Sequence, residues 1–154
     1  SKGDVYEGGH RVPLYVSWPA GGIPMNKEVP NLVAHWDLFA TLANLTGLEI
    51  PRGQAVDSVS FAHHLRPGLG GPERESIAMM GTDFHGNWFS ALRWRNYKLV
   101  MPTARQQNPT PVADKSKYEL YDLSTDMAET RDLSRDPAHQ ATASQIHRGF
   151  MEYL

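Results

Sequence analysis

The chain has 154 residues, a formal charge of −2 and no cysteine. This length accommodates one ordinary domain or a large piece of one, and a hydrophobic content of 40% suffices for a core. The composition excludes disulfides and a cysteine nucleophile, and without a basic run there is no reason to expect nucleic acid as a partner. No apolar run reaches the roughly 18 residues of a membrane span. The compartment stays open, periplasm and secretion included.

The first half of the chain has the pattern of an α/β fold. The apolar residues 11–18 follow a Gly-Gly pair and end at a proline, which predicts a strand buried on both faces. Asp37 as N-cap and Gly47 as the terminating residue bound a predicted helix. Its predicted apolar face consists of Phe39, Leu42 and Leu45. A second short helix is predicted within 57–65.

The second half predicts a small antiparallel sheet. Its four strand candidates are residues 76–81, 88–94, 97–102 and 118–123. Only Arg95 and Asn96 separate the middle two, which is the spacing of a β-hairpin. A terminal helix is expected to begin at Asp136 and Pro137, with an apolar stripe of Ala143, Ile146, Phe150 and Leu154. We therefore expect two domains, 1–70 and 71–154.

The residues alone provide weak indications of chemistry. The pair Gly8-Gly9 allows positive φ and a close backbone approach, so Lys2 could bind an anion there, although an exposed lysine beside an ordinary turn has the same pattern. Glu7 and Arg11 are four residues apart, a spacing that is usually structural or solvated. The turn 83–86 contains a possible acid/base pair, or is simply a polar loop.

The seven histidines do not predict a metal site. His63 and His64 are adjacent, so on a helix they point about 100° apart and cannot chelate as an i, i+4 pair would. His139 and His147 have no carboxylate pair at ligand spacing. From the residues alone we can assemble no catalytic machinery, and we expect no metal bound by this chain.

Five segments in order resemble the C-terminal portion of the sulfatases, within the alkaline-phosphatase superfamily. The first, "SKGDVYEGGHRVP", is similar to the second sulfatase signature, K-G-x-x-Y-E-G-G-x-R-V-P. Residues 35–51, 55–65 and 91–100 resemble the family's helix, its D-G-x-S-L segment and its R-x-x-x-Y-K-L hairpin. Residues 118–134 are similar to its E-L-Y-D-L-x-x-D-P-x-E run. Four scaffold positions depart from these patterns: Ala40, Ser58, Met127 and Asp132.

The resemblance implies a mixed α/β fold. Residues 1–70 would form the last strand and helices of the main mixed sheet, at the C-terminal end of a catalytic domain. Residues 71–154 would form a four-stranded antiparallel subdomain with a packed terminal helix. In the family, the lysine that matches Lys2 contacts the sulfate and stabilises its developing charge, which makes Lys2 the expected catalytic residue.

Other site residues are also implied by the resemblance. Glu7, Gly8, Gly9 and Arg11 would support Lys2, and His85 and Arg105 would contact the substrate from loops. The calcium ligands and the formylglycine nucleophile would come from the N-terminal part of the same sulfatase, so this chain alone is expected to be inactive. The expected partner is a sulfate ester. A phosphonate or phosphate monoesterase of the same superfamily and a non-catalytic scaffold are the alternatives.

Overall fold

The computed structural model describes residues 3–83, 85–104 and 109–154. They form two compact units. The sheet unit consists of the described residues of 1–12 and 76–154, and the helical unit consists of residues 13–75. Residues 3–12 thus group with residues 76–154, because Val5 is buried against the sheet. The division into 1–70 and 71–154, with residues 1–70 as the C-terminal end of a catalytic domain, stays a prediction.

The sheet unit contains a four-stranded antiparallel sheet in the order β1-β2-β3-β4. The strands are β1 (Ser76–Thr82), β2 (Trp88–Trp94), β3 (Tyr97–Pro102) and β4 (Glu119–Asp122). Trp94 pairs with Tyr97 across the two-residue turn, in which Arg95 adopts a φ of 53°. The predicted hairpin and the expected mixed α/β class are both confirmed.

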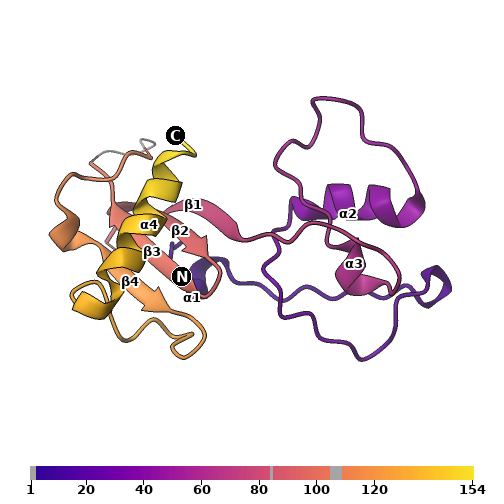
Figure 1. Ribbon diagram of the computed structural model, residues 1–154, viewed down its shortest axis with the longest axis horizontal. Helices are drawn as coiled ribbons and strands as arrows, with labels where there is room; N and C mark the ends of the chain where they lie inside the picture. Colours follow the sequence, from indigo (N-terminus) through magenta and orange to yellow (C-terminus); the bar gives the residue numbers. More distant parts are fainter. Residues whose placement is uncertain (1–2, 84, 105–108) are drawn as a thin grey trace. The chain divides into compact units, whose positions relative to one another are not determined.

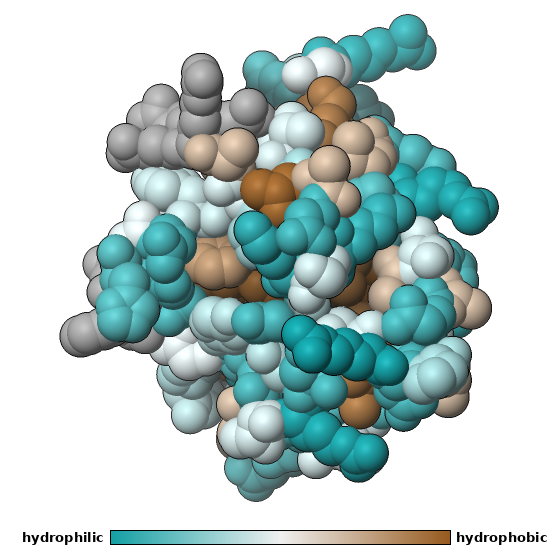
Figure 2. Space-filling view, turned by 90° about the vertical axis from the view of Figure 1, so that its left-hand side faces the viewer, coloured by the Kyte–Doolittle hydropathy of each residue, from teal (hydrophilic) through white to brown (hydrophobic). Residues whose placement is uncertain are grey.

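Apolar residues cover both faces of this sheet. On one face, helix α4 (Gln140–Met151) lies over the sheet (Figure 1), and its Ile146 and Phe150 belong to one buried cluster with Leu92 and Leu99. A 3-10 helix, η3 (Pro137–His139), precedes α4, and the carboxylate of Asp136 accepts a hydrogen bond from its backbone as predicted. A further 3-10 helix, η2 (Lys115–Lys117), lies before β4. The side of the sheet unit shown in Figure 2 is mainly hydrophilic.

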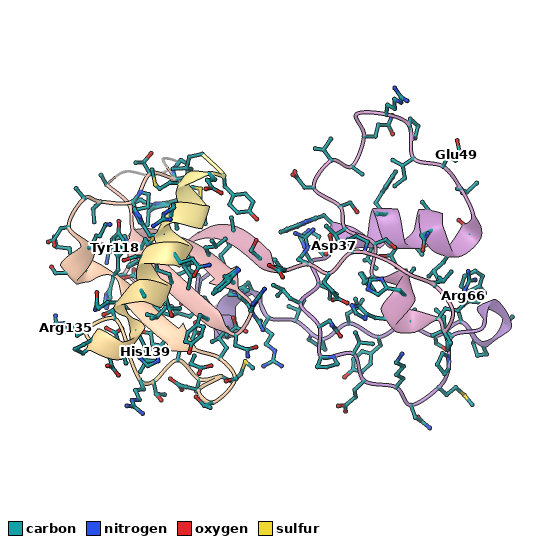
Figure 3. All side chains as sticks on the ribbon, in the orientation of Figure 1. Asp37, Glu49, Arg66, Tyr118, Arg135 and His139 are labelled. Atoms are coloured by element: carbon teal, nitrogen blue, oxygen red, sulfur yellow. The ribbon has the colours of Figure 1, made fainter. Side chains whose placement is uncertain are left out.

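The helical unit contains η1 (Pro19–Gly21), α2 (Asp37–Thr46) and α3 (Ala62–Leu65). A small core of Ile23, Leu45 and Ala62 joins the helices. Asp37 lies at the start of α2 (Figure 3), where its carboxylate accepts hydrogen bonds from the backbone of Ala34 and Val59. Asp37 is therefore the first helical residue rather than the cap, and Gly47 ends α2 with a φ of 73° as predicted.

Two predictions for the helical part of the chain are wrong. Residues 11–18 form no strand and are exposed; Tyr15 is 90% exposed. All strands of the described chain belong to the sheet unit, so the helical unit offers no neighbour to which 13–18 could bond its backbone. The predicted apolar face of α2 is also mostly exposed. Of its three residues only Leu45 is buried, while Phe39 and Leu42 face outward.

In the part of the chain that the structure describes, no helix has the length and apolarity needed to cross a bilayer.

Candidate functional site

The segment that follows Lys2 docks on the free edge of strand β1. The carbonyl of Gly3 accepts a hydrogen bond from the backbone of Thr82 at 3.1 Å, and Asp4 forms a parallel bridge with Thr82. The approach is so close that a Cβ on Gly81 would lie 2.4 Å from the Gly3 oxygen. A glycine in β1 therefore makes room for the N-terminal segment.

The Glu-Gly-Gly turn forms the single-turn helix α1 (Glu7–His10). Gly9 packs against the backbone of Asp4, where a Cβ would come within 2.4 Å of the Asp4 carbonyl oxygen. Gly8 faces open space, and neither glycine has a positive φ. The predicted close backbone approach is thus confirmed at Gly9, and the predicted positive φ is wrong, because the turn is a right-handed helical one.

Glu7 is buried beside Lys98 of β3. The Lys98 side chain is fully buried, and its Nζ lies 3.2 Å from Glu7 Oε1 and 2.7 Å from Glu129 Oε1. The backbone N–H of Glu7 also donates to Glu129 Oε2 at 2.5 Å. Two carboxylates and one ammonium therefore form a closed charged cluster that fixes α1 to the sheet.

Two more basic side chains, His10 and Arg93, lie beside the same carboxylate. His10 Nε2 lies 3.3 Å from Glu7 Oε1, and an Arg93 nitrogen lies 3.7 Å from Oε2. Burial alone would raise the pKa of Glu7, but the hydrogen bond with His10 and the charges of Lys98 and Arg93 lower it to about 2. Glu7 is thus ionised at neutral pH. It pairs with these groups rather than with Arg11, whose side chain is exposed.

Tyr6 extends the contact to strand β4. Its hydroxyl donates to Glu119 Oε2 at 2.7 Å, and the hydroxyl of Tyr121 donates to the same oxygen at 2.8 Å. The two rings meet edge to face. Burial, together with the Glu119 carboxylate, raises the pKa of both tyrosines. Residues 6 and 7 are therefore held by β3, β4 and the turn that contains Glu129.

The loops predicted to contact substrate meet at one pocket of the sheet unit. This pocket of about 520 Å³ is lined by Gly86, Asn87, Trp88, Phe89, Pro102, Thr103, Ala104, Val112 and Lys117. The backbone N–H of Thr103 donates to the carbonyl of Trp88, and this hydrogen bond joins the two sides of the pocket. Asp83 organises the nearer turn by accepting hydrogen bonds from the backbone of His85 and from Asn87. These hydrogen bonds lower the pKa of Asp83, and the bond from the Asn87 side chain has the largest effect.

The predicted site residues are only partly described. Lys2 and Arg105 lie outside the described residues. His85 is exposed and does not line the pocket. It lies in the turn that follows Thr82, and the backbone N–H of Thr82 donates to the carbonyl of Gly3. The segments next to Lys2 and His85 therefore share one edge of the sheet. The roles predicted for these residues stay predictions.

Sequence reasoning missed Lys98, Glu119 and Glu129 as parts of the site. All three lie in segments that were compared with family motifs, and a lysine inside the apolar run "YKLVM" was a usable signal. The partners could not be assigned, because 91 residues separate Glu7 from Lys98. The three motif segments thus converge on one buried cluster.

Solved structures first define the class of fold. A sulfatase from Bacteroides thetaiotaomicron aligns with a TM-score of 0.63 and 23% identity, over 85% of this chain and 27% of that chain. A structure solved in complex with its substrate D-glucosamine-2-N,6-O-disulfate aligns with a TM-score of 0.55 and 15% identity, over 76% of this chain and 23% of that one. The fold is that of the C-terminal part of sulfatases.

Curated relatives agree with this fold. Human arylsulfatase G is 27% identical over 161 residues, which cover 100% of this chain and 30% of the relative. Rat steryl-sulfatase is 33% identical over 94 residues, 61% of this chain and 15% of the relative. The chain thus spans less than a third of the length of these relatives. No family model matches it. Sequence and fold together confirm the predicted resemblance to the C-terminal portion of a sulfatase.

Proposed function

We propose that the protein carrying this chain hydrolyses sulfate esters, and that this chain contributes Lys2 as a contact to the sulfate. This role is supported by the contacts that hold the segment after Lys2 on the sheet. Gly3 is bonded to Thr82, and Glu7 is tied to the buried Lys98. A catalytic charge has to be fixed in this way, because a displacement of about 0.5 Å already weakens its interaction with the transition state.

The chemical task of Lys2 is electrostatic. A sulfate monoester carries a negative charge, and more charge develops on its oxygens as the bond between sulfur and the leaving oxygen breaks. An ammonium group in a site from which water is excluded stabilises that charge more in the transition state than in the ground state. In this proposal the Glu7 turn holds the segment without touching the substrate. Arg11 contributes through its backbone N–H, which donates to the carbonyl of Glu7, since its side chain is exposed.

The pocket next to the 83–87 turn is the proposed substrate side of the site. His85 and Arg105 belong to the two loops that border it and would contact the part of the substrate that carries the sulfate. The relatives include aryl- and steryl-sulfatases, and one fold neighbour was solved with a sulfated glucosamine. Aryl, steryl and sugar sulfates are therefore the substrates to compare.

The calcium ion and formylglycine of sulfatases do not fit the described residues of this chain. Calcium takes six to eight oxygen ligands. Glu7 and Glu129, two carboxylates at the turn, are already engaged by Lys98. The three-residue cluster with metal-ligand spacing is His63, His64 and Glu73, two of which offer nitrogen. Both groups would have to come from outside this chain, from the N-terminal part of the same protein.

Replacing Lys2 tests the proposal. In the intact protein we expect Lys2→Ala to lower kcat/KM for a sulfate ester by about 10²–10³-fold, the usual effect of removing one oxyanion-stabilising group. Lys27→Ala, at an exposed lysine of the helical unit that does not line the pocket, is the matched control and should keep full activity. Thermal unfolding of both variants checks that the fold is intact. Unchanged turnover in Lys2→Ala would contradict the role of Lys2, and a preference of the parent for phosphate or phosphonate esters would contradict the reaction.

A further inference from the structure

Two adjacent histidines and a glutamate converge at the surface of the helical unit. His63 and His64 lie on α3. The chain turns back after Arg66, so that the carboxylate of Glu73 reaches the Nε2 atoms of both rings. Nε2 of His63 is 3.3 Å from Glu73 Oε1, and Nε2 of His64 is 3.0 Å from Oε2. One ligand atom from each of the three residues lies within 4.8 Å of the other two.

The convergence depends on features that helical spacing does not reveal. The rings of His63 and His64 lie 4.0 Å apart at their centroids on the single-turn helix α3, and the Nε2 atom of each contacts Glu73 of the returning chain. Gly71 packs on His63 so closely that a Cβ there would lie 2.4 Å from Nδ1. The separation of about 100° that was expected for adjacent helical histidines is therefore not seen at these two rings.

From this geometry we infer that His63, His64 and Glu73 bind a divalent transition-metal ion such as Zn²⁺ or Co²⁺. An ion held tetrahedrally about 2.0–2.1 Å from each ligand needs ligand atoms about 3.3 Å apart. The two histidine nitrogens lie 3.3 and 3.0 Å from different oxygens of Glu73, and one ligand atom from each of the three residues lies within 4.8 Å of the other two. Two imidazoles and one carboxylate favour zinc, cobalt, nickel or copper over calcium or magnesium. Glu73 is 53% exposed, which leaves the outer coordination position open to water.

The ligands are held in place by their neighbours. Asn31 donates to Glu73 Oε2 at 3.2 Å, and Lys27 donates to the carbonyl of His64 at 2.6 Å. Arg74, next to Glu73 in the chain, forms a two-pronged ion pair with the buried Asp37. Such anchoring preorganises a site before the metal arrives.

Cobalt spectroscopy on the intact protein tests the site directly. After chelator treatment, Co²⁺ is titrated in excess Ca²⁺, which occupies oxygen-rich sites, and the visible absorption of nitrogen-bound Co²⁺ is followed. We expect one equivalent with the wild type and at least a tenfold weaker association with Glu73→Gln and with His64→Gln. His35→Gln, an exposed histidine of the same unit, is the matched control and should bind like the wild type.

Zn²⁺ and thermal unfolding provide a second measurement that does not depend on enzymatic activity. A metal that binds only the folded state raises the Tm, so Zn²⁺ should stabilise the wild type and His35→Gln but not Glu73→Gln. His63 is left unchanged because its ring packs on Gly71 and its loss could unfold α3. The inference is overturned if the wild type gives no cobalt band, or if Glu73→Gln and His64→Gln bind cobalt like the wild type.

Discussion

Lys98 is the residue on which the N-terminal turn depends. It is fully buried in a strand whose other central residues are apolar, and its ammonium lies between Glu7 and Glu129. A buried ion pair contributes little net stability over a well-packed apolar pair, but removing one partner leaves the other charges buried and unpaired. The cluster therefore acts mainly to specify where α1 docks.

Lys98→Met should test this dependence. The apolar chain fills the space, but it leaves two carboxylates facing each other, so we expect a loss of about 3–5 kcal/mol in the free energy of unfolding. Lys117→Met, at a side chain that is 64% exposed, should change it by less than about 0.5 kcal/mol. Urea denaturation compares the two. Equal midpoints would mean that the buried cluster is dispensable.

At the scale of elements, the neighbouring glycines of α1 have different tasks. Gly9 touches the backbone of Asp4, whereas Gly8 has open space where a side chain would project. We expect Gly9→Ala to destabilise the protein by about 1–3 kcal/mol through overpacking. Gly8→Ala should be neutral, or stabilising by up to about 1 kcal/mol, because it restricts the unfolded chain. Thermal denaturation of both variants measures the difference. A similar loss of stability in the two variants would refute the different roles given to Gly8 and Gly9.

The elements also show what the sequence could and could not predict. The hairpin at Arg95 followed from local turn spacing, and α4 followed from its apolar stripe, of which Ile146 and Phe150 are buried. The strand at 11–18 did not form, because apolarity indicates burial but supplies no pairing partner. Contacts between distant segments, such as Glu7 with Lys98 or His64 with Glu73, leave no periodic signal. The candidate site was therefore predicted as a set of motifs, without its supporting ionic cluster.

At the scale of the whole molecule, the depressed pKa of Glu7 makes its stabilising effect dependent on pH. The pKa is about 2 in the folded chain, below the ordinary value of 4.5, so the folded state binds its proton less readily than the unfolded one. The stabilisation is present above about pH 4.5 and is lost as the pH falls toward 2.

Glu7→Gln isolates this effect from the titration of other carboxylates. The variant should be less stable than the wild type at pH 7 by about 2–3 kcal/mol, and the gap should close between pH 4.5 and 2. Glu152→Gln, at an exposed position, should follow the wild type throughout. Thermal melts at stepped pH values measure the gap. If it stays constant down to pH 2, the ionic cluster is not its source.

The docking of α1 on Lys98 and Glu129 also has a consequence for the order of folding during synthesis. The helical unit, residues 13–75, is enclosed within the sequence of the sheet unit. At about 5–20 residues per second, its helices can form while the partners of Glu7 are still untranslated. Glu7 can be held in place only after two partners have left the ribosome: Lys98, which pairs with its carboxylate, and Glu129, which accepts a hydrogen bond from its backbone N–H. Within these 154 residues, a segment that is made early is thus among the last to reach its final position.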